Sequence, residues 1–246
     1  MPDSRKKYTS IHTNRTMMFA ELEKVMDYSI EADTYQEALA RNITGKKSES
    51  GAKITSGKLK KLYSFDMQDA LFMAFKFFWK LVETQHRSLI AFIYAVNHDD
   101  LLAQSSNVIC KYEFENQVPV VAFEENIEKY YPKLFSPKTR KSTSQNIASS
   151  WKQAGFIEGK IKNIRVQPDI NYQVACFAFF LAYLKGDRGE FIWKNTGVKA
   201  LCLSESKLRE LAVECKQRDL MEYQSAGEVT TISFNQLMKK TGIDAI

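Results

Sequence analysis

The sequence predicts a mainly α fold, a helical bundle with two small β-hairpins, on three observations. Apolar residues recur at helical spacing along most of the chain. The segment 66–85 is apolar over more than half of a helical circumference, which predicts a helix at the centre of the bundle. Two short stretches, 156–166 and 220–234, instead alternate on either side of glycine-containing turns, which predicts antiparallel hairpins.

The elements are expected in the following order. A short basic tail runs to about Tyr8, and helices near 14–30 and 34–41 form an α-hairpin. The polar, glycine-punctuated stretch 42–57 predicts a loop. The segment 99–114 is compatible with either a short helix or an extended piece. Further helices are expected at 66–85, 86–98, 122–131, 137–154, 171–186 and 204–219, with a loop at 185–197.

Two portions are expected in the domain organisation. The first is an N-terminal helical portion, 1–120, and the second is a C-terminal portion, 121–246. The second contains a basic helix and ribbon at 121–168 and a terminal helix and hairpin at 204–240. One continuous domain is the alternative.

Composition excludes several classes of function. No apolar run approaches the roughly 20 residues that span a bilayer, and no signal peptide is expected at the N-terminus, so we expect no membrane partner. The four cysteines and three histidines are scattered without metal-ligand spacing, which predicts no metal, no cofactor and free thiols in a reducing cytoplasm. No histidine lies in a polar setting that suggests a Ser or Cys nucleophile as its partner, and no phosphate-binding, dinucleotide or hydrolase motif occurs. The chain is therefore predicted not to be an enzyme.

The positive charge is concentrated in one window. Residues 131–165 hold eight Lys or Arg against the single acid Glu158, a local charge of +7 in a chain whose total is +6. Everything outside this window sums to −1. A local excess of this kind indicates either a nucleic-acid-binding surface or a solvated basic helix.

Within this window the sequence predicts a helix and then a ribbon. Ser136 suits the N-cap, Pro137 suits the first helical position, and Gly155 suits the residue that ends the helix. One helical face carries lysine, hydroxyl and amide groups, and the ribbon that follows is basic. With the acidic helix 122–131 before it, this order resembles a winged helix–turn–helix. The candidate nucleic-acid-binding residues here are Lys138, Lys141, Ser142, Gln145, Ser149, Lys152, Lys160, Lys162 and Arg165.

Arg140 is the exception, because it lies on the apolar side of the predicted helix. We expect it to form an ion pair with Glu124, Glu125 or Glu128 rather than to contact a phosphate.

A second basic stretch follows the α-hairpin. It contains six lysines, Lys53 among them, and a single acid, Glu49. It is interpreted either as a second clamp on a phosphate backbone or as a solubilising loop. The five lysines assigned to the clamp are Lys46, Lys47, Lys58, Lys60 and Lys61.

The chain resembles the BrxA family of BREX bacteriophage-exclusion systems. The resemblance lies in the N-terminal segment YTSIHTNRTMMFAELEKVM and in FSPKTRKSTSQNIASSWKQAGFI, which follows the family's S-x-x-T-R … A-G-hydrophobic pattern. The matching residues are Ser136, Thr139, Arg140, Gly155, Phe156 and Ile157. The resemblance implies a core likened to NusB, a cytoplasmic role in phage defence and DNA binding. It also implies partners among the system's methyltransferase and restriction factors, and no catalytic residues.

Two functions stay open on the sequence alone. The first is binding of double-stranded DNA through the helix 137–154 and the ribbon 156–166, with RNA binding as a variant that composition does not separate from it. The second is a protein–protein assembly adaptor, in which the basic face meets an acidic partner or the C-terminal hairpin pairs with another strand.

Overall fold

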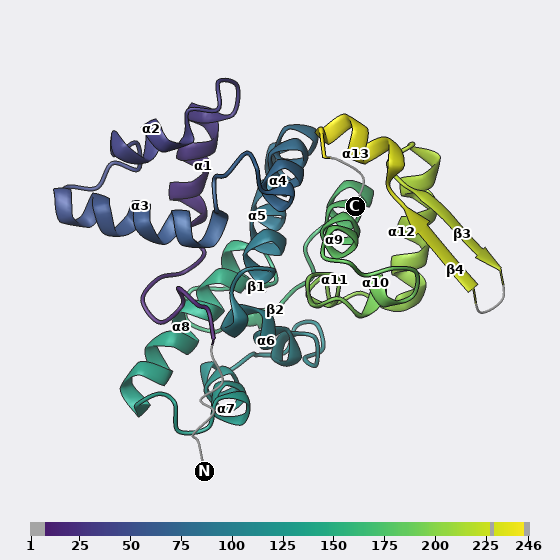
Figure 1. Ribbon diagram of the computed structural model, residues 1–246. Helices are drawn as coiled ribbons and strands as arrows, with labels where there is room; N and C mark the ends of the chain where they lie inside the picture. The colour runs from purple at the N-terminus through teal and green to yellow at the C-terminus, as the bar shows by residue number, and fades with distance from the viewer. Residues whose placement is uncertain (1–7, 227–228, 244–246) are drawn as a thin grey trace, which may run out of the picture. The chain divides into compact units, whose positions relative to one another are not determined.

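The structure is a computed structural model that describes residues 8–226 and 229–243 (Figure 1). It confirms a mainly helical chain with two small antiparallel hairpins. The helices are α1 Phe19–Ser29, α2 Tyr35–Ala40, α3 Glu49–Tyr63, α4 Ala70–Leu81, α5 Arg87–Val96, α6 Asp100–Ile109, α7 Val120–Tyr130, α8 Pro137–Gln153, α9 Tyr172–Leu184, α10 Phe191–Lys194, α11 Thr196–Lys199, α12 Glu205–Gln217 and α13 Asn235–Thr241, with a 3-10 turn, η1, at Thr84–His86. The strands are β1 Ile157–Glu158, β2 Ile164–Arg165, β3 Glu222–Ala226 and β4 Val229–Ser233.

These elements group into two compact units. One unit combines the chain up to Tyr63 with Ala95–Pro168, and the other combines Ser64–Tyr94 with the chain from Asp169 onward. Each unit is thus built from two separate stretches of sequence. The expected boundary between 120 and 121 falls inside the first unit, at the start of α7.

The second unit is organised around α9. All residues from Val174 to Ala182 are buried, and α4 packs against this helix through aromatic rings. The ring centroids of Phe78 and Phe177 are 5.1 Å apart, and those of Phe180 and Phe234 are also 5.1 Å apart. Both pairs are tilted, with interplanar angles of 45° and 43°, and ring contacts at this spacing add to the free energy of burial.

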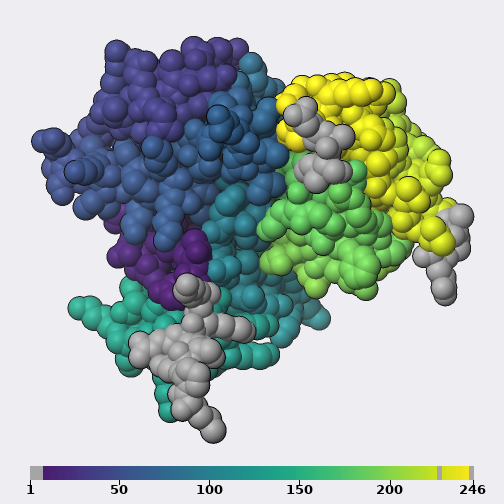
Figure 2. Space-filling model, viewed as in Figure 1, coloured from purple at the N-terminus to yellow at the C-terminus, as the bar shows by residue number. Residues whose placement is uncertain are grey.

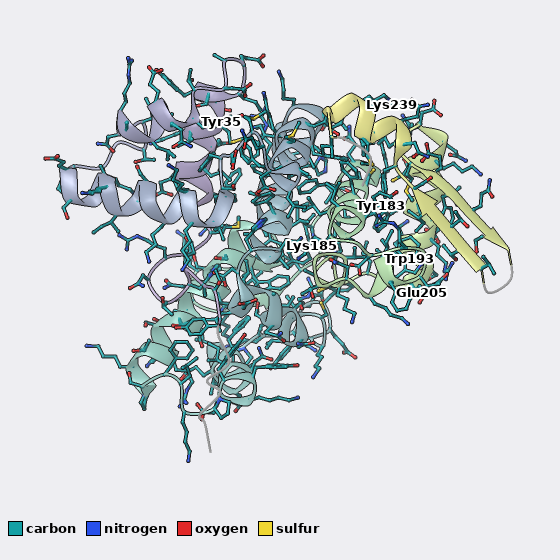
Figure 3. All side chains as sticks on the ribbon, viewed as in Figure 1. Tyr35, Tyr183, Lys185, Trp193, Glu205 and Lys239 are labelled. Carbon is teal, nitrogen blue, oxygen red and sulfur yellow. The ribbon has the colours of Figure 1, made fainter. Side chains whose placement is uncertain are left out.

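A polar cluster on α12 supports the second hairpin. Arg209 donates to Glu190 at 2.8 Å and to Glu205 at 2.8 Å, and Glu190 also accepts a hydrogen bond from Thr230 of β4. The Arg209 guanidinium lies over the ring of Trp193. Figure 3 labels Trp193 and Glu205. Arg209 also donates to the Tyr223 hydroxyl of β3 and to the Thr230 hydroxyl of β4, so the hairpin is attached to α12 by hydrogen bonds.

Three expected loops or ambiguous segments are helical. The loop expected at 42–57 is wrong in its second half, because α3 begins at Glu49 and includes two glycines. Ala52, Thr55, Leu59 and Leu62 form a buried stripe on α3, and this burial offsets the cost of about 1 kcal/mol for each helical glycine. The loop expected at 185–197 contains α10 and the first two residues of α11, and the ambiguous segment 99–114 contains α6.

The second hairpin is confirmed over its strands. Glu222 pairs with Ser233 and Ala226 pairs with Val229, so the chain turns between residues 226 and 229. Residues 227 and 228, which include part of the expected turn, lie outside the described residues, as does the basic tail at 1–7.

Two other expectations concern the thiols and the membrane. Cys176 and Cys215 are free and buried, as expected, whereas the expectation of a free thiol is wrong for Cys110 and Cys202, which are disulfide-bonded. Among the described residues, no helix has both the length and the apolar character needed to cross a bilayer.

Candidate nucleic-acid interface

In the first unit α7, α8 and the β1–β2 ribbon follow one another and are in contact (Figure 1). Glu128 of α7 holds the turn between the two helices. Its carboxylate accepts the backbone N–H of Lys133 at 3.0 Å and forms an ion pair with Arg140 of α8. These two bonds keep the pKa of Glu128 below its usual value. The expected ion pair of Arg140 is therefore confirmed, with Glu128 as its partner.

The limits of α8 follow the local signals in the sequence. The Ser136 side chain accepts the backbone N–H of Thr139 at 3.2 Å, and Pro137 is the first helical residue. After α8, Gly155 adopts a φ of +84°, a conformation that favours glycine. The helix therefore ends where the basic ribbon begins.

The two faces of α8 differ in burial. Thr143, Ile147 and Trp151 are fully buried, and the Trp151 indole N–H donates to the Ser105 hydroxyl at 2.6 Å. On the opposite face Lys138, Lys141, Ser142 and Gln145 are exposed, while Ser149 and Lys152 are half-buried. The amphipathic pattern of the helix is thus confirmed.

A third row of α8 side chains fixes the segment before α1, which the sequence did not indicate. Asn146 donates to the backbone carbonyl of His12 at 2.8 Å, and Gln153 accepts the backbone N–H of Phe19 at 3.1 Å. Between them, Ser150 accepts the backbone N–H of Met17 at 2.9 Å. Their i, i+4 and i+7 spacing places these polar groups in one row, but only the folded chain shows what they bind.

The same serine belongs to a buried chain of hydrogen bonds with His12 and Asp99. His12 Nδ1 lies 2.8 Å from Asp99 Oδ2, and His12 Nε2 lies 2.9 Å from Ser150 Oγ. No local pattern in the sequence paired a histidine with a serine or cysteine; the folded chain does so for His12, whose partners Asp99 and Ser150 are 87 and 138 residues away in sequence.

The hydrogen-bonded series Asp99–His12–Ser150 has the residue types of a catalytic triad, but a substrate has no access to these side chains. His12 and Ser150 are fully buried, and Asp99 is 1% exposed. The Ser150 hydroxyl accepts the Met17 N–H and donates to the Asn146 carbonyl, so its hydrogen bonds are made inside the protein. Burial raises the pKa of Asp99, but the contact with His12 and two backbone N–H bonds outweigh this effect and lower it overall. The chain of bonds thus joins the N-terminal segment, α6 and α8.

The β1–β2 ribbon follows α8, and its segment Phe156–Val166 stands where the sequence predicts a wing. Ile157 pairs with Arg165 and Glu158 pairs with Ile164. A third segment, residues 115–118, joins its base, since the Val118 N–H donates to the Asn163 carbonyl at 2.7 Å. This wing, Phe156–Val166, is held along one edge by residues 115–118, and its turn, Gly159–Lys162, is exposed.

Arg165 is the main correction among the candidate binding residues. It is 1% exposed, and its guanidinium donates to the carbonyls of Phe156 and Val166 and to the side chain of Gln167. It also stacks over the rings of Phe156 and Phe114. Burial lowers the pKa of Arg165 to about 10. Arg165 therefore supports the base of the wing and is not available to a phosphate.

Replacing Arg165 with methionine is expected to destabilise the protein by about 1–3 kcal/mol, because buried carbonyl oxygens lose their donors. Urea unfolding measures this loss. Lys162→Met, in the exposed part of the wing, is the matched control and is expected to change stability by less than about 0.5 kcal/mol. Equal stability of both variants with the parent protein would contradict the supporting role of Arg165.

The remaining cations of the region divide in two groups. Lys152 is half-buried and donates to the Gly159 carbonyl at 2.7 Å, so it braces the wing against α8. Lys138, Lys141, Lys160 and Lys162 are exposed, and among the described residues no acid forms an ion pair with them. Four lysines on α8 and the wing are thus free to meet a partner.

The second basic stretch lies partly on α3 and is not a single loop. Lys46 forms an ion pair with Glu21 at 2.6 Å, so it is a poor candidate for a phosphate contact. Lys47, Lys53 and Lys60 line a groove of about 660 Å³ between α2 and α3, in the purple-to-blue part of the surface (Figure 2). Lys58 and Lys61 lie outside that groove.

No metal-ligating cluster of three or more His, Cys, Asp or Glu occurs in the part of the chain that the structure describes. No protein-family model matches the sequence, and neither the curated proteins nor the solved structures include a match to it.

Proposed function

We propose that this protein is a non-enzymatic DNA-binding protein that docks on duplex DNA through α8 and the wing. The supporting observation is the sorting of cations in the basic window. Arg140 and Arg165 have partners inside the protein and Lys152 braces the wing, whereas Lys138, Lys141, Lys160 and Lys162 are exposed along one helix and the ribbon that follows it. Exposed lysines neutralise phosphates and release counterions.

The polar groups on the outer face of α8 are suited to base edges. The Gln145 side chain is exposed and forms no hydrogen bond with another described residue, so its amide N–H groups and its carbonyl oxygen are available. A glutamine in the major groove pairs with adenine N6 and N7 in a bidentate manner. The Ser142 hydroxyl donates to the Thr139 carbonyl at 3.0 Å, so Ser142 acts as an acceptor.

Duplex DNA fits this surface better than RNA does. The major groove of B-form DNA is about 12 Å wide and admits a helix, whereas the major groove of A-form RNA is deep and narrow. Single-strand binding relies on aromatic stacking, and the outer face of α8 carries no aromatic residue.

The resemblance to BrxA supports the biological setting of this proposal. Within it, the protein is a DNA-binding component of a bacterial BREX phage-defence system and works with that system's methyltransferase and restriction factors in the cytoplasm. Ser136, Arg140 and Gly155, which carry part of the resemblance, have structural roles here as helix cap, ion-pair partner and helix end.

A salt titration of binding to a random-sequence duplex tests the function, with single-stranded DNA and duplex RNA as competitors. Four to five phosphate contacts predict a slope of about −4 in log K against log salt, a roughly 150- to 500-fold loss between 50 and 200 mM salt. A slope near −8 would add the second basic stretch, through Lys47, Lys58, Lys60 and Lys61, to the interface. Absence of binding at about 50 mM salt would overturn the proposal.

The alternative function, an assembly adaptor, has its own supporting observation. The β3–β4 ribbon contains only two strands among the described residues, and Val229 is 68% exposed. Unpaired strand edges accept an added strand from a partner. Deletion of 218–246 does not test this function cleanly, because it removes Phe234, which is buried against Phe180 in the core of the second unit.

A further inference from the structure

The tip of the wing carries an apolar side chain that contacts almost nothing. Ile161 is 96% exposed, the highest value among the large hydrophobic residues that the structure describes. Lys160 and Lys162, on either side of it, are exposed as well. Single apolar residues on a surface are ordinary, so exposure alone assigns no role to Ile161. Its support within the wing is the second observation.

The turn that presents Ile161 is fixed at Gly159. Gly159 adopts a φ of +89°, and a Cβ there would lie 2.4 Å from the Lys162 carbonyl oxygen, so only glycine allows the turn to close this tightly. The Lys152 ammonium group donates to the Gly159 carbonyl at 2.7 Å and ties the turn to the last part of α8.

The base of the wing is equally constrained. The buried Arg165 guanidinium binds the carbonyls at its foot, and the backbone of Val118 pairs with Asn163. A braced ribbon does not fold its tip back onto the protein surface, so the isoleucine stays in water at a fixed position relative to α8.

We propose that Ile161 is a wedge that enters the minor groove of bound DNA and partly unstacks one base step. This inference rests on the proposed function of α8 and the wing. Apolar side chains, isoleucine among them, insert between base steps from the minor groove and kink the duplex, while neighbouring cations contact the phosphates. Lys160 and Lys162 supply those cations, and α8 occupies the adjacent major groove.

Through the wedge, the protein distinguishes DNA sites by how easily a base step unstacks, in addition to its contacts with base edges. Pyrimidine–purine steps such as TA unstack at the lowest energetic cost, so sites that place such a step under the wing are preferred. A residue that acts by insertion contributes through its shape and apolar surface, whereas the lysines contribute through charge. The two contributions are therefore separable by experiment.

The test uses the full-length protein and a short duplex that carries a FRET pair at its ends and 2-aminopurine at a central TA step. The parent protein is expected to bend the duplex and to raise 2-aminopurine fluorescence. Ile161→Ala is expected to lose both signals and to bind about 5- to 10-fold more weakly, with an unchanged salt slope. Ile161→Leu, which keeps the apolar volume, is expected to retain both signals.

The possible outcomes distinguish the wedge from the proposed DNA binding on which it rests. Binding by the parent protein with the predicted salt slope but without bending or unstacking overturns the wedge and leaves DNA binding in place. Equal bending by Ile161→Ala has the same meaning. No duplex binding by the parent protein overturns both. Because Ile161 is 96% exposed, its substitutions are not expected to unfold the protein, and urea unfolding of Ile161→Ala checks this point.

Discussion

Replacing Lys138 and Lys141 together with glutamate is expected to weaken binding to duplex DNA by roughly 100-fold or more at low salt. Each substitution removes one phosphate contact and places a negative charge against the DNA backbone. Both side chains are exposed on the outer face of α8, and among the described residues neither has an ionic partner inside the protein. Fluorescence anisotropy with a labelled duplex, together with the salt slope, measures the change.

The fold is expected to survive this double substitution. Lys138 is the second residue of α8, where a carboxylate interacts favourably with the helix dipole by about 0.3–1 kcal/mol. Lys152 is left unchanged, although it belongs to the same basic face, because its bond to the Gly159 carbonyl supports the wing. A variant with Lys152→Glu would mix loss of charge with loss of structure.

The double variant Lys239→Glu/Lys240→Glu is the matched control. These two lysines are exposed in the last turn of α13, in the second unit, and their replacement changes the net charge of the protein by the same amount. If the two double variants weaken DNA binding equally, the attraction comes from net charge and not from the surface of α8 and the wing.

The local signals around α8 predicted most of its structure. Ser136, Pro137 and Gly155 act on their immediate backbone neighbours, so their effect is visible in the sequence. The pairing of Arg140 with an acid of the preceding helix followed from its place on the apolar side. In each of these cases the determining contact lies within about a dozen residues along the chain.

Contacts between distant segments account for what the sequence did not predict. Alternation in the ribbon placed Arg165 among the outward basic residues, but its guanidinium lies against the ring of Phe114, from a distant part of the sequence, and donates to the carbonyls of Phe156 and Val166. Helix α3 forms in spite of its two glycines because its apolar stripe is buried. A local pattern shows which face of an element is apolar but not which other segment covers the polar one.

The buried His12–Asp99 pair shows this limit most clearly, and replacing Asp99 with asparagine is expected to cost about 3–5 kcal/mol of stability at neutral pH. The Asp99 carboxylate accepts hydrogen bonds from the Ser10 hydroxyl, the backbone N–H groups of Ile11 and Leu102, and the ring of His12. An asparagine has one acceptor oxygen and no charge, so several of these buried donors lose their partner. Urea unfolding measures the loss.

The pH dependence of this loss identifies its origin. The pKa of Asp99 is lower in the folded protein than in the unfolded chain, so its stabilising contribution is present above the unfolded pKa of about 4. That contribution disappears as the pH falls through the folded pKa. The difference in stability between the parent protein and Asp99→Asn is therefore expected to be constant from about pH 5 to 7 and to shrink below about pH 4.

Asp100→Asn is the control for this prediction, because Asp100 is the next residue and is exposed. Its carboxylate accepts only one hydrogen bond from a described residue, from the backbone N–H of Thr9 at 2.7 Å, and its replacement is expected to cost less than about 1 kcal/mol. A similar cost for both variants, or a difference that persists unchanged at pH 3, would mean that the Asp99 carboxylate does not hold the N-terminal segment through its charge.

Because Ser150 of α8 closes the same series of hydrogen bonds, Asp99→Asn is also expected to loosen the helix that carries the basic surface. DNA affinity should then fall in Asp99→Asn and stay unchanged in Asp100→Asn.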